Sequence, residues 1–172
     1  TGTSKNVTIS KGSTGKREYT ATWEPVTYSI TYVLDGGTVA TANKSEYTIE
    51  SEAFTLINPT KKGYKFLGWS EGSSSDKQGT VTIAKGTTGN KTFTAHWEEN
   101  TYTISYELDG GTNGDGNPST YKVTDNDIKL AEPTKKGYTF EGWTGTDISE
   151  TSKDVTISKG SVGNRTYTAN WK

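Results

Sequence analysis

The chain has 172 residues, of which 28% are hydrophobic and 11% aromatic, and its 19 basic and 20 acidic side chains leave a net charge of −1. Nucleic-acid and membrane-surface proteins need a concentrated basic field, so this balance predicts neither nucleic-acid binding nor membrane contact by this segment. The absence of cysteine excludes disulfides and thiolate metal sites.

The chain is organised as a tandem repeat. The pattern Lys-Lys-Gly-Tyr-x-Phe-x-Gly-Trp occupies residues 61–69 and returns, without a gap, 74 residues later at residues 135–143. The opening of the chain matches the end of a repeat at the same offset. We therefore predict three parts, because fixed-period similarity marks a repeat architecture. These are residues 1–24 as the C-terminal part of a truncated repeat, residues 25–98 as the first full repeat and residues 99–172 as the second.

The opening segment ends in Tyr19, Ala21 and Trp23, which alternate with polar residues. This period of two predicts the last strand of a repeat. Its neighbours in the sheet are missing, so it must remain unattached, pack on the next repeat or pair with another chain through its exposed edge, and we favour the last two. The chain begins without Met and in mid-repeat, so we expect a piece of a longer polypeptide.

Three-residue joints, residues 24–26 and 98–100, connect the parts. Joints this short leave little slack, so we expect neighbouring repeats to form a semi-rigid row.

Four strands are predicted within a repeat. In the second copy they are residues 102–108, which end at Asp109-Gly110-Gly111, then 121–123, 138–143 and 166–171. Residues 127–133 fit either a short helical turn or a loop. No segment predicts a helix of ten or more residues.

Three motifs in a fixed order, at residues 102–111, 133–143 and 167–171, resemble the Listeria–Bacteroides repeat, the family that includes the B repeats of internalin-type surface proteins. The resemblance covers essentially the whole chain, apart from a longer loop between Trp143 and Val155. It implies an α+β, mostly β fold of tandem small β-grasp-like (ubiquitin-like) modules. It also implies an extracellular location, at the bacterial cell surface or in the cell wall, with no catalytic residues and no cofactor.

Most of the aromatic side chains are expected in the cores, because modules this small need them there. Trp69 and Trp143 follow a glycine and fall on the opposite parity to Phe66 and Phe140. Gly142 is expected to mark a bulge or a strand end that re-aims Trp143. We therefore predict that both tryptophans are partly exposed, and they are the candidate ligand-contact aromatics.

No other residue predicts a catalytic, cofactor-binding or metal site. Residues 113–117 resemble a calcium loop but lack its distal acidic ligand, so we expect a flexible turn. His96 is the only histidine and is expected to face water. The lysine pairs at residues 61–62 and 135–136 are expected to be solvated turn residues.

These observations predict a non-enzymatic repeat segment of a bacterial surface or secreted protein, acting as a stalk or spacer and in adhesion. The expected partners are a host-cell protein or glycan and the neighbouring repeats of the parent chain. Two alternatives stay open. One is a binding module that recognises a host protein or glycan through exposed aromatics or a sheet edge. The other is an accessory module of a secreted carbohydrate-active enzyme.

Overall fold

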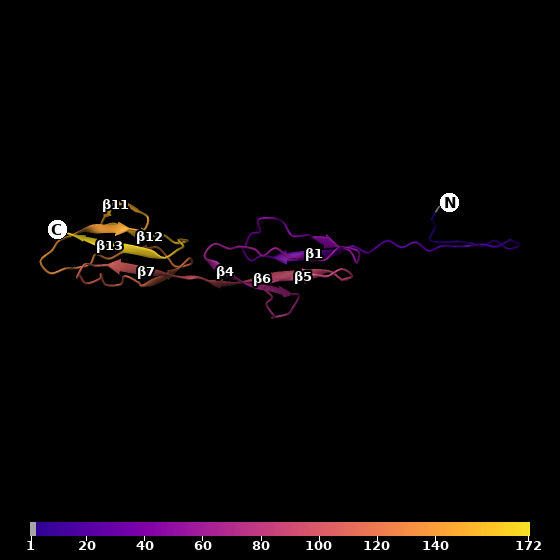
Figure 1. The fold of residues 1–172 in the computed structure, drawn as a ribbon, viewed down its shortest axis with the longest axis horizontal. Coiled ribbons are helices and arrows are strands. Elements are labelled where there is room, and N and C mark those ends of the chain that lie inside the picture. The colour runs from indigo at the N-terminus through magenta and orange to yellow at the C-terminus, as the bar shows by residue number, and fades with distance from the viewer. Residues whose placement is uncertain (1–2) are drawn as a thin grey trace.

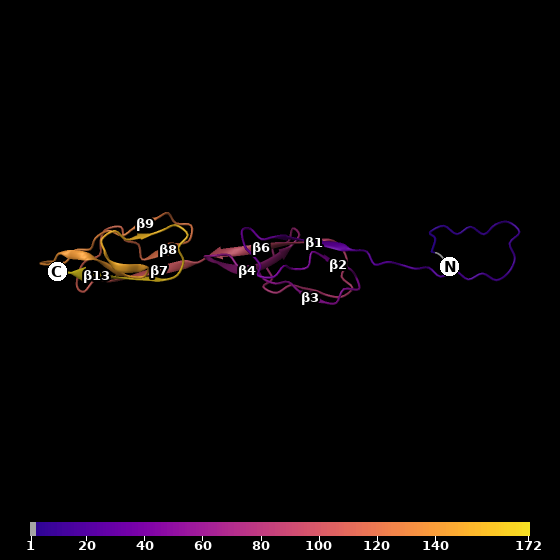
Figure 2. The same cartoon turned by 90° about the horizontal axis from the view of Figure 1, so that it is seen from above.

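The computed structural model describes residues 3–172. Two β-modules lie end to end, and the N-terminal segment extends away from the first of them (Figures 1 and 2). Within residues 3–172 every regular element is a strand, so the mostly-β prediction is confirmed and its α component is wrong. The ambiguous stretch at residues 127–133 contains the short strand β9 instead of a helical turn.

The first module has a four-stranded sheet in the order β2-β1-β6-β4 and a separate β3-β5 pair. Its strands are β1 (Tyr28–Val33), β2 (Glu46–Tyr47), β3 (Phe54–Thr55), β4 (Tyr64–Glu71), β5 (Thr82–Ile83) and β6 (Lys91–Glu99). The first and last strands, β1 and β6, are parallel neighbours at the centre of the sheet, and both outer strands pair antiparallel.

The second module repeats this order as β8-β7-β13-β10, with one additional edge strand, β11, beside β10. Its strands are β7 (Thr101–Glu107), β8 (Thr120–Lys122), β9 (Ile128–Lys129), β10 (Phe140–Gly145), β11 (Ile148–Ser152), β12 (Thr156–Ile157) and β13 (Arg165–Trp171). In the first module a single bridge between Trp69 and Gln78 stands where the second has the β10–β11 hairpin. The loop that departs from the family pattern therefore forms the extra strand.

The Asp-Gly-Gly turn ends the first strand of both modules, as predicted. Asp35 and Asp109 both have a φ of 47°, a left-handed conformation that aspartate tolerates. The last glycine of the turn lies under a tryptophan ring: a Cβ on Gly37 would come 2.4 Å from Trp97. That indole donates a 3.1 Å hydrogen bond to the Leu34 carbonyl, so turn and last strand are locked together.

Each module has its own aromatic core. Trp69 and Trp143 lie at the centre of the two cores with 1% and 0% of their surface exposed, so the predicted partial exposure is wrong. The predicted bulge is present, because the ladder shifts register at Gly68 and at Gly142. The extra residue turns each tryptophan back to the inner face, beside the phenylalanine three positions earlier.

Residues 3–27 form no strand, and Trp23 is 90% exposed. The predicted strand and its packing on the next repeat are therefore wrong; pairing with another chain stays a prediction. The physical reason lies in the sheet order. The last strand of each module lies between two others: β6 between β1 and β4, and β13 between β7 and β10. The opening segment has neither neighbour, so its backbone has no ladder to join.

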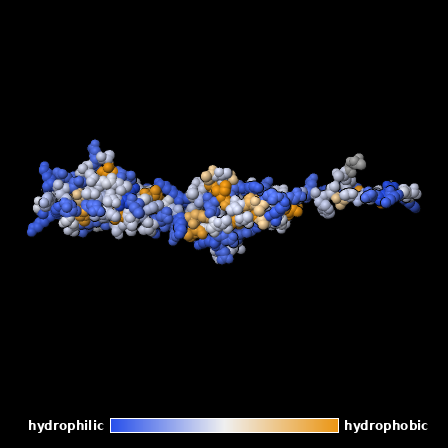
Figure 3. Space-filling model, viewed as in Figure 1, coloured by the Kyte–Doolittle hydropathy of each residue, from blue (hydrophilic) through white to orange (hydrophobic). Residues whose placement is uncertain are grey.

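The surface seen in Figure 3 is largely hydrophilic, with small separate apolar patches over the modules. Among residues 3–172 there is no helix that is long and apolar enough to cross a membrane.

Candidate functional site

The turn at the start of the shared motif, residues 61–64 and 135–138, is here called the socket turn. Its first lysine is held in place: the Lys61 ammonium donates a 2.7 Å hydrogen bond to the Asp35 carbonyl and lies 4.3 Å from the Tyr64 ring centroid. In the second module Lys135 lies 4.4 Å from the Tyr138 ring centroid, but its ammonium donates a 2.8 Å hydrogen bond to the Asp109 carboxylate instead of to the backbone carbonyl. Only 22% and 17% of the two lysine side chains are exposed, so the solvated-turn prediction is wrong for the first lysine of each pair.

The two modules are joined by a single residue between strands. β6 ends at Glu99 and β7 begins at Thr101, so only Asn100 separates the last strand of one module from the first strand of the next. The Asn100 N–H donates a 2.9 Å hydrogen bond to the carbonyl of Gly63 in the socket turn. The ladder of the first module therefore ends where the second module begins.

A side chain of the second module packs on this socket turn. Val123 lies at the tip of a β-turn, residues 122–125, here called the knob turn. A Cβ built on Gly63 would lie only 2.6 Å from the Val123 Cβ, so the valine rests directly on the glycine backbone. Gly63 is buried and has a φ of 80°. Glycine is needed here both for its backbone conformation and for the close approach.

A polar contact flanks the knob. The Glu99 carboxylate accepts hydrogen bonds from the Thr124 backbone N–H at 3.2 Å and from its hydroxyl at 2.5 Å. Lys122 lies 3.8 Å from the same carboxylate. The junction between the modules is thus an apolar knob on a glycine socket, closed on one side by an acid–hydroxyl contact.

The other residues singled out in the sequence lie apart from this junction. Trp69 and Trp143 are buried, so neither offers a surface to a ligand in this structure. His96 is half-buried and 2.8 Å from the Ser70 hydroxyl, so it does not simply face water. In the calcium-like loop, Asn117 bonds Asn113 at 2.8 Å and thereby holds the turn. Across residues 3–172, no three His, Asp or Glu side chains are grouped to hold a metal ion.

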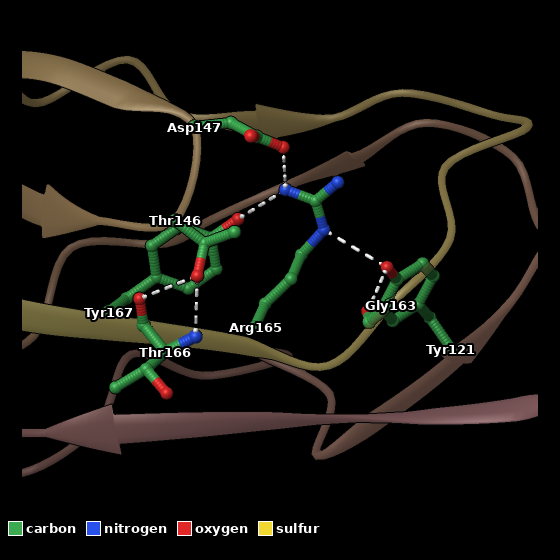
Figure 4. Close-up of polar contacts among 7 residues, drawn as sticks. All are labelled: Tyr121, Thr146, Asp147, Gly163, Arg165, Thr166 and Tyr167. Atoms are coloured by element: carbon green, nitrogen blue, oxygen red, sulfur yellow. Dashed lines mark hydrogen bonds and ion pairs between the residues drawn. The ribbon is translucent and has the colours of Figure 1, made fainter.

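The second module also contains a buried guanidinium (Figure 4). Arg165, 8% exposed, donates hydrogen bonds to the Tyr121 hydroxyl at 3.0 Å, to Asp147 at 2.8 Å and to the Tyr167 hydroxyl at 3.4 Å. Burial lowers the pKa of the guanidinium, whereas these three hydrogen bonds raise it, and the net pKa lies above the ordinary value. Arg165 is therefore always charged and cannot act as a proton donor.

A hollow of about 430 Å³ opens beside the β10–β11 hairpin, next to Arg165. Its lining is rich in serine, threonine and acidic side chains from residues 146–156, together with Tyr167. Neither histidine nor cysteine is among its lining residues. The arrangement offers hydrogen bonds to a polar ligand.

Comparison with known proteins assigns the family. The model of the Listeria-Bacteroides repeat domain matches residues 28–96 and 102–170, one match for each sheet. The chain belongs to the Listeria-Bacteroides repeat family. The family expected from the three sequence motifs is confirmed, and so is the description of the chain as a repeat segment.

Several relatives of this Listeria-Bacteroides repeat chain are known. It is 30% identical over 151 residues to Internalin H of Listeria monocytogenes serovar 1/2a, covering 85% of this chain and 26% of that protein. It is also 30% identical over 126 residues to a "putative membrane protein" of Evansella cellulosilytica, covering 72% of this chain and 18% of that protein. The chain thus spans about a quarter or less of these relatives.

Among solved structures, the chain aligns with domains 3-4 of the "Streptococcal High Identity Repeats in Tandem (SHIRT)" of a cell surface protein. The identity is 15% and the TM-score 0.26, with 84% of this chain and 96% of that chain covered.

Proposed function

We propose that this chain is a non-catalytic stalk or spacer segment of a bacterial protein exposed at the cell surface or in the cell wall. The observation that carries the proposal is the junction, where one residue separates β6 from β7 and Val123 rests on Gly63. A joint of this kind sets each repeat in line with the last, as Figure 1 shows, so every copy adds length. The extracellular location is supported by family membership and by the similarity to Internalin H.

We infer that each module is β-grasp-like, with residues 25–98 and 99–172 as the two units and residues 1–24 as the end of another. The β-grasp reading is supported by the parallel first and last strands at the sheet centre, each flanked by an antiparallel strand. The unit boundaries are supported by two separate aromatic cores and by the two family matches.

The spacer proposal can be tested by reach. The chain is anchored to beads through its C-terminus, with an epitope tag at its N-terminus, beneath a polymer layer that blocks antibody access. We expect tag exposure to rise stepwise when a further copy of residues 25–172 is added in register. A Gly/Ser linker with the same number of residues is the control, because a flexible coil reaches only roughly 5–6 Å × √n. Equal exposure for repeats and linker would contradict the proposal.

A second candidate, adhesion to a host protein or glycan, is favoured by one observation: the polar hollow beside the β10–β11 hairpin. Hydroxyl and carboxylate groups that converge in a concave site suit hydrogen bonding to a sugar. Beads that display many copies of the chain would be tested on host cells and a glycan array. Saturable binding that is lost in Ser149→Trp, which obstructs the hollow, would support adhesion. No binding at high valency would leave the spacer role.

The remaining alternative, an accessory module of a carbohydrate-active enzyme, has a simple discriminator: a catalytic domain adjacent in the parent sequence would support it, and the absence of one would contradict it.

A further inference from the structure

The knob turn has an unpartnered copy in the first module. Residues 48–51 close the same β-turn as residues 122–125, and Ile49 stands where the second module has Val123. The carbonyl of each knob residue accepts a 3.0 Å hydrogen bond from a glycine N–H, Gly86 in one module and Gly160 in the other. The two knobs are therefore built alike, yet Ile49 is 44% exposed.

The socket turn has an unpartnered copy as well. Gly137 has a φ of 81°, against 80° for Gly63, and the turn is closed by the same hydrogen bond between its first and fourth residues. A Cβ on Gly137 would meet nothing within 4 Å, whereas one on Gly63 would strike Val123. Tyr138 of this turn is 55% exposed, whereas the corresponding Tyr64 is half-buried.

We propose that the Ile49 knob turn and the Gly137 socket turn are the two halves of a docking interface, and that each binds the complementary end of another repeat of this kind. The inference rests on the spacer function and specifies the surface and the partner through which the row is kept straight. We infer that the partner is another repeat because a knob turn and a socket turn of this kind already contact each other within the chain, at Val123 and Gly63.

The sequence before the first module also indicates that its partner is another repeat. Residues 7–23 match residues 81–97 of the first module at the 74-residue offset, so the end of a repeat directly precedes this module. The joint between them has the same length as the joint at residues 98–100, with Pro25 at the Glu99 position and Val26 at the Asn100 position.

This joint is compatible with the same backbone pairing. Asn100 donates its N–H to Gly63, so by the alternation of an antiparallel ladder the preceding position, Glu99, makes no ladder hydrogen bond. Proline is therefore tolerated there, and Val26 retains the N–H that would bond the socket glycine. The acid–hydroxyl contact is not repeated, since Pro25 replaces Glu99 and Glu50 replaces Thr124. The apolar knob and the glycine socket are what the two junctions share.

The test uses the full chain followed directly by a second copy of residues 25–172, which continues the 74-residue period. Because the chain lacks cysteine, spin labels can be placed at chosen pairs. Exposed Thr92→Cys and Thr103→Cys span the existing joint, while Thr166→Cys and Ser29→Cys of the added copy span the new one at matched positions. Pulsed dipolar spectroscopy then gives the distribution of distances across each joint.

We expect narrow distributions of the same mean at both joints. Asparagine tolerates a positive φ, so Gly137→Asn keeps the turn but places a side chain where the knob would dock. This substitution should remove the narrow distribution at the new joint alone. Ile49→Asp in the added copy should do the same without touching a glycine. Gly137→Asn in the unextended chain serves as the folding control.

A broad distribution at the new joint before any substitution would overturn the proposal, and so would a narrow one that survives both changes. Either of these outcomes refutes the docking interface alone if the extended chain still raises tag exposure above that of the Gly/Ser linker. The spacer function would then stand.

Discussion

The two repeats share several contacts to backbone carbonyls and differ in most of the polar contacts between their side chains. The hydroxyls of Tyr47 and Tyr121 donate to the Gly89 and Gly163 carbonyls at 2.5 Å and 2.6 Å, and the last tryptophan of each repeat donates to a leucine carbonyl at 3.1 Å. Among the ion pairs within a repeat, Lys61–Asp35 recurs as Lys135–Asp109, but the others do not recur. A Lys91–Glu71 pair stands where the second repeat has the Arg165 network.

This difference teaches which features specify the module. Turns, buried aromatics and hydrogen bonds to backbone carbonyls are common to both copies, so these determine the fold. Most polar pairs between side chains differ between the copies, so we expect them to set how stable each copy is. Substitutions at matched positions 74 residues apart can test this division.

The largest difference between matched substitutions is expected at the buried guanidinium. Arg165→Ala removes three hydrogen bonds and the packing of the arginine stem, a loss of about 2–4 kcal/mol from the second repeat. Lys91→Ala, its counterpart, removes one ion pair to a half-exposed glutamate and should cost about 0–1 kcal/mol. Amide hydrogen exchange reports the opening free energy of each repeat separately. Equal losses in the two repeats would contradict the contrast.

The socket glycines form the next pair. Gly63→Ala and Gly137→Ala carry the same strain of a positive φ, about 1–2 kcal/mol each. Gly63→Ala alone also meets Val123, and overpacking of this kind adds about 1–3 kcal/mol. Unfolding by urea measures both variants. Gly137→Ala is the control, because it carries the same backbone strain without the contact to Val123. Equal losses of unfolding free energy in the two variants would show that Val123 moves aside freely.

A stabilising change should come from the two central tryptophans. The Trp69 indole donates to the Asn58 side chain at 3.0 Å, whereas the buried Trp143 indole N–H has no partner and Glu132 occupies the asparagine position. Glu132→Asn is expected to supply that partner and to stabilise the second repeat by about 1 kcal/mol. The reverse experiment, Asn58→Ala, should cost about 1–3 kcal/mol, since it leaves a buried donor unpaired.

The indole N–H resonance of Trp143 shows directly whether the bond has formed. A stability gain without a shift of that resonance would assign the effect to the lost charge of Glu132 instead.

The smallest effect appears at alkaline pH. Burial, followed by the nearby Tyr167, raises the pKa of Tyr106 to about 12 from 10.0. Since the folded pKa exceeds the unfolded one, this contribution to stability is complete below pH 10 and is lost as the pH rises through about 12. Burial raises the pKa of Tyr32 in the same direction in the first repeat.

Tyr106→Phe should therefore make the second repeat less sensitive to base, at the expense of the hydrogen bond to the Pro118 carbonyl. Ultraviolet absorbance of tyrosinate across this range follows the titration. An unchanged alkaline loss of stability would contradict the assignment.

Much of the fold could be predicted because alternation and turn glycines are local signals. The strand β7 and the turn at Asp109 follow from them directly. The burial of Trp143 could not be predicted by counting positions, because the bulge at Gly142 reverses the parity, and the strand predicted around Trp23 fails for want of neighbours. Both outcomes depend on residues far along the chain.

The junction was also missed, although a signal was present. An aliphatic residue stands at the tip of an otherwise polar turn in both copies, as Ile49 and Val123. A solvent-exposed turn has no need of such a residue. A repeated apolar turn position is therefore a sequence indicator of contact between neighbouring repeats.

The parallel pairing of first and last strands has a mechanical consequence. In each repeat the chain enters along one central strand and leaves along its hydrogen-bonded parallel neighbour, β1 with β6 and β7 with β13. Tension applied to the two chain ends then slides these strands past each other, so their hydrogen bonds bear the load together instead of opening one after another. We expect a repeat of this kind to resist an end-to-end pull more strongly than a fold whose hydrogen bonds open one at a time.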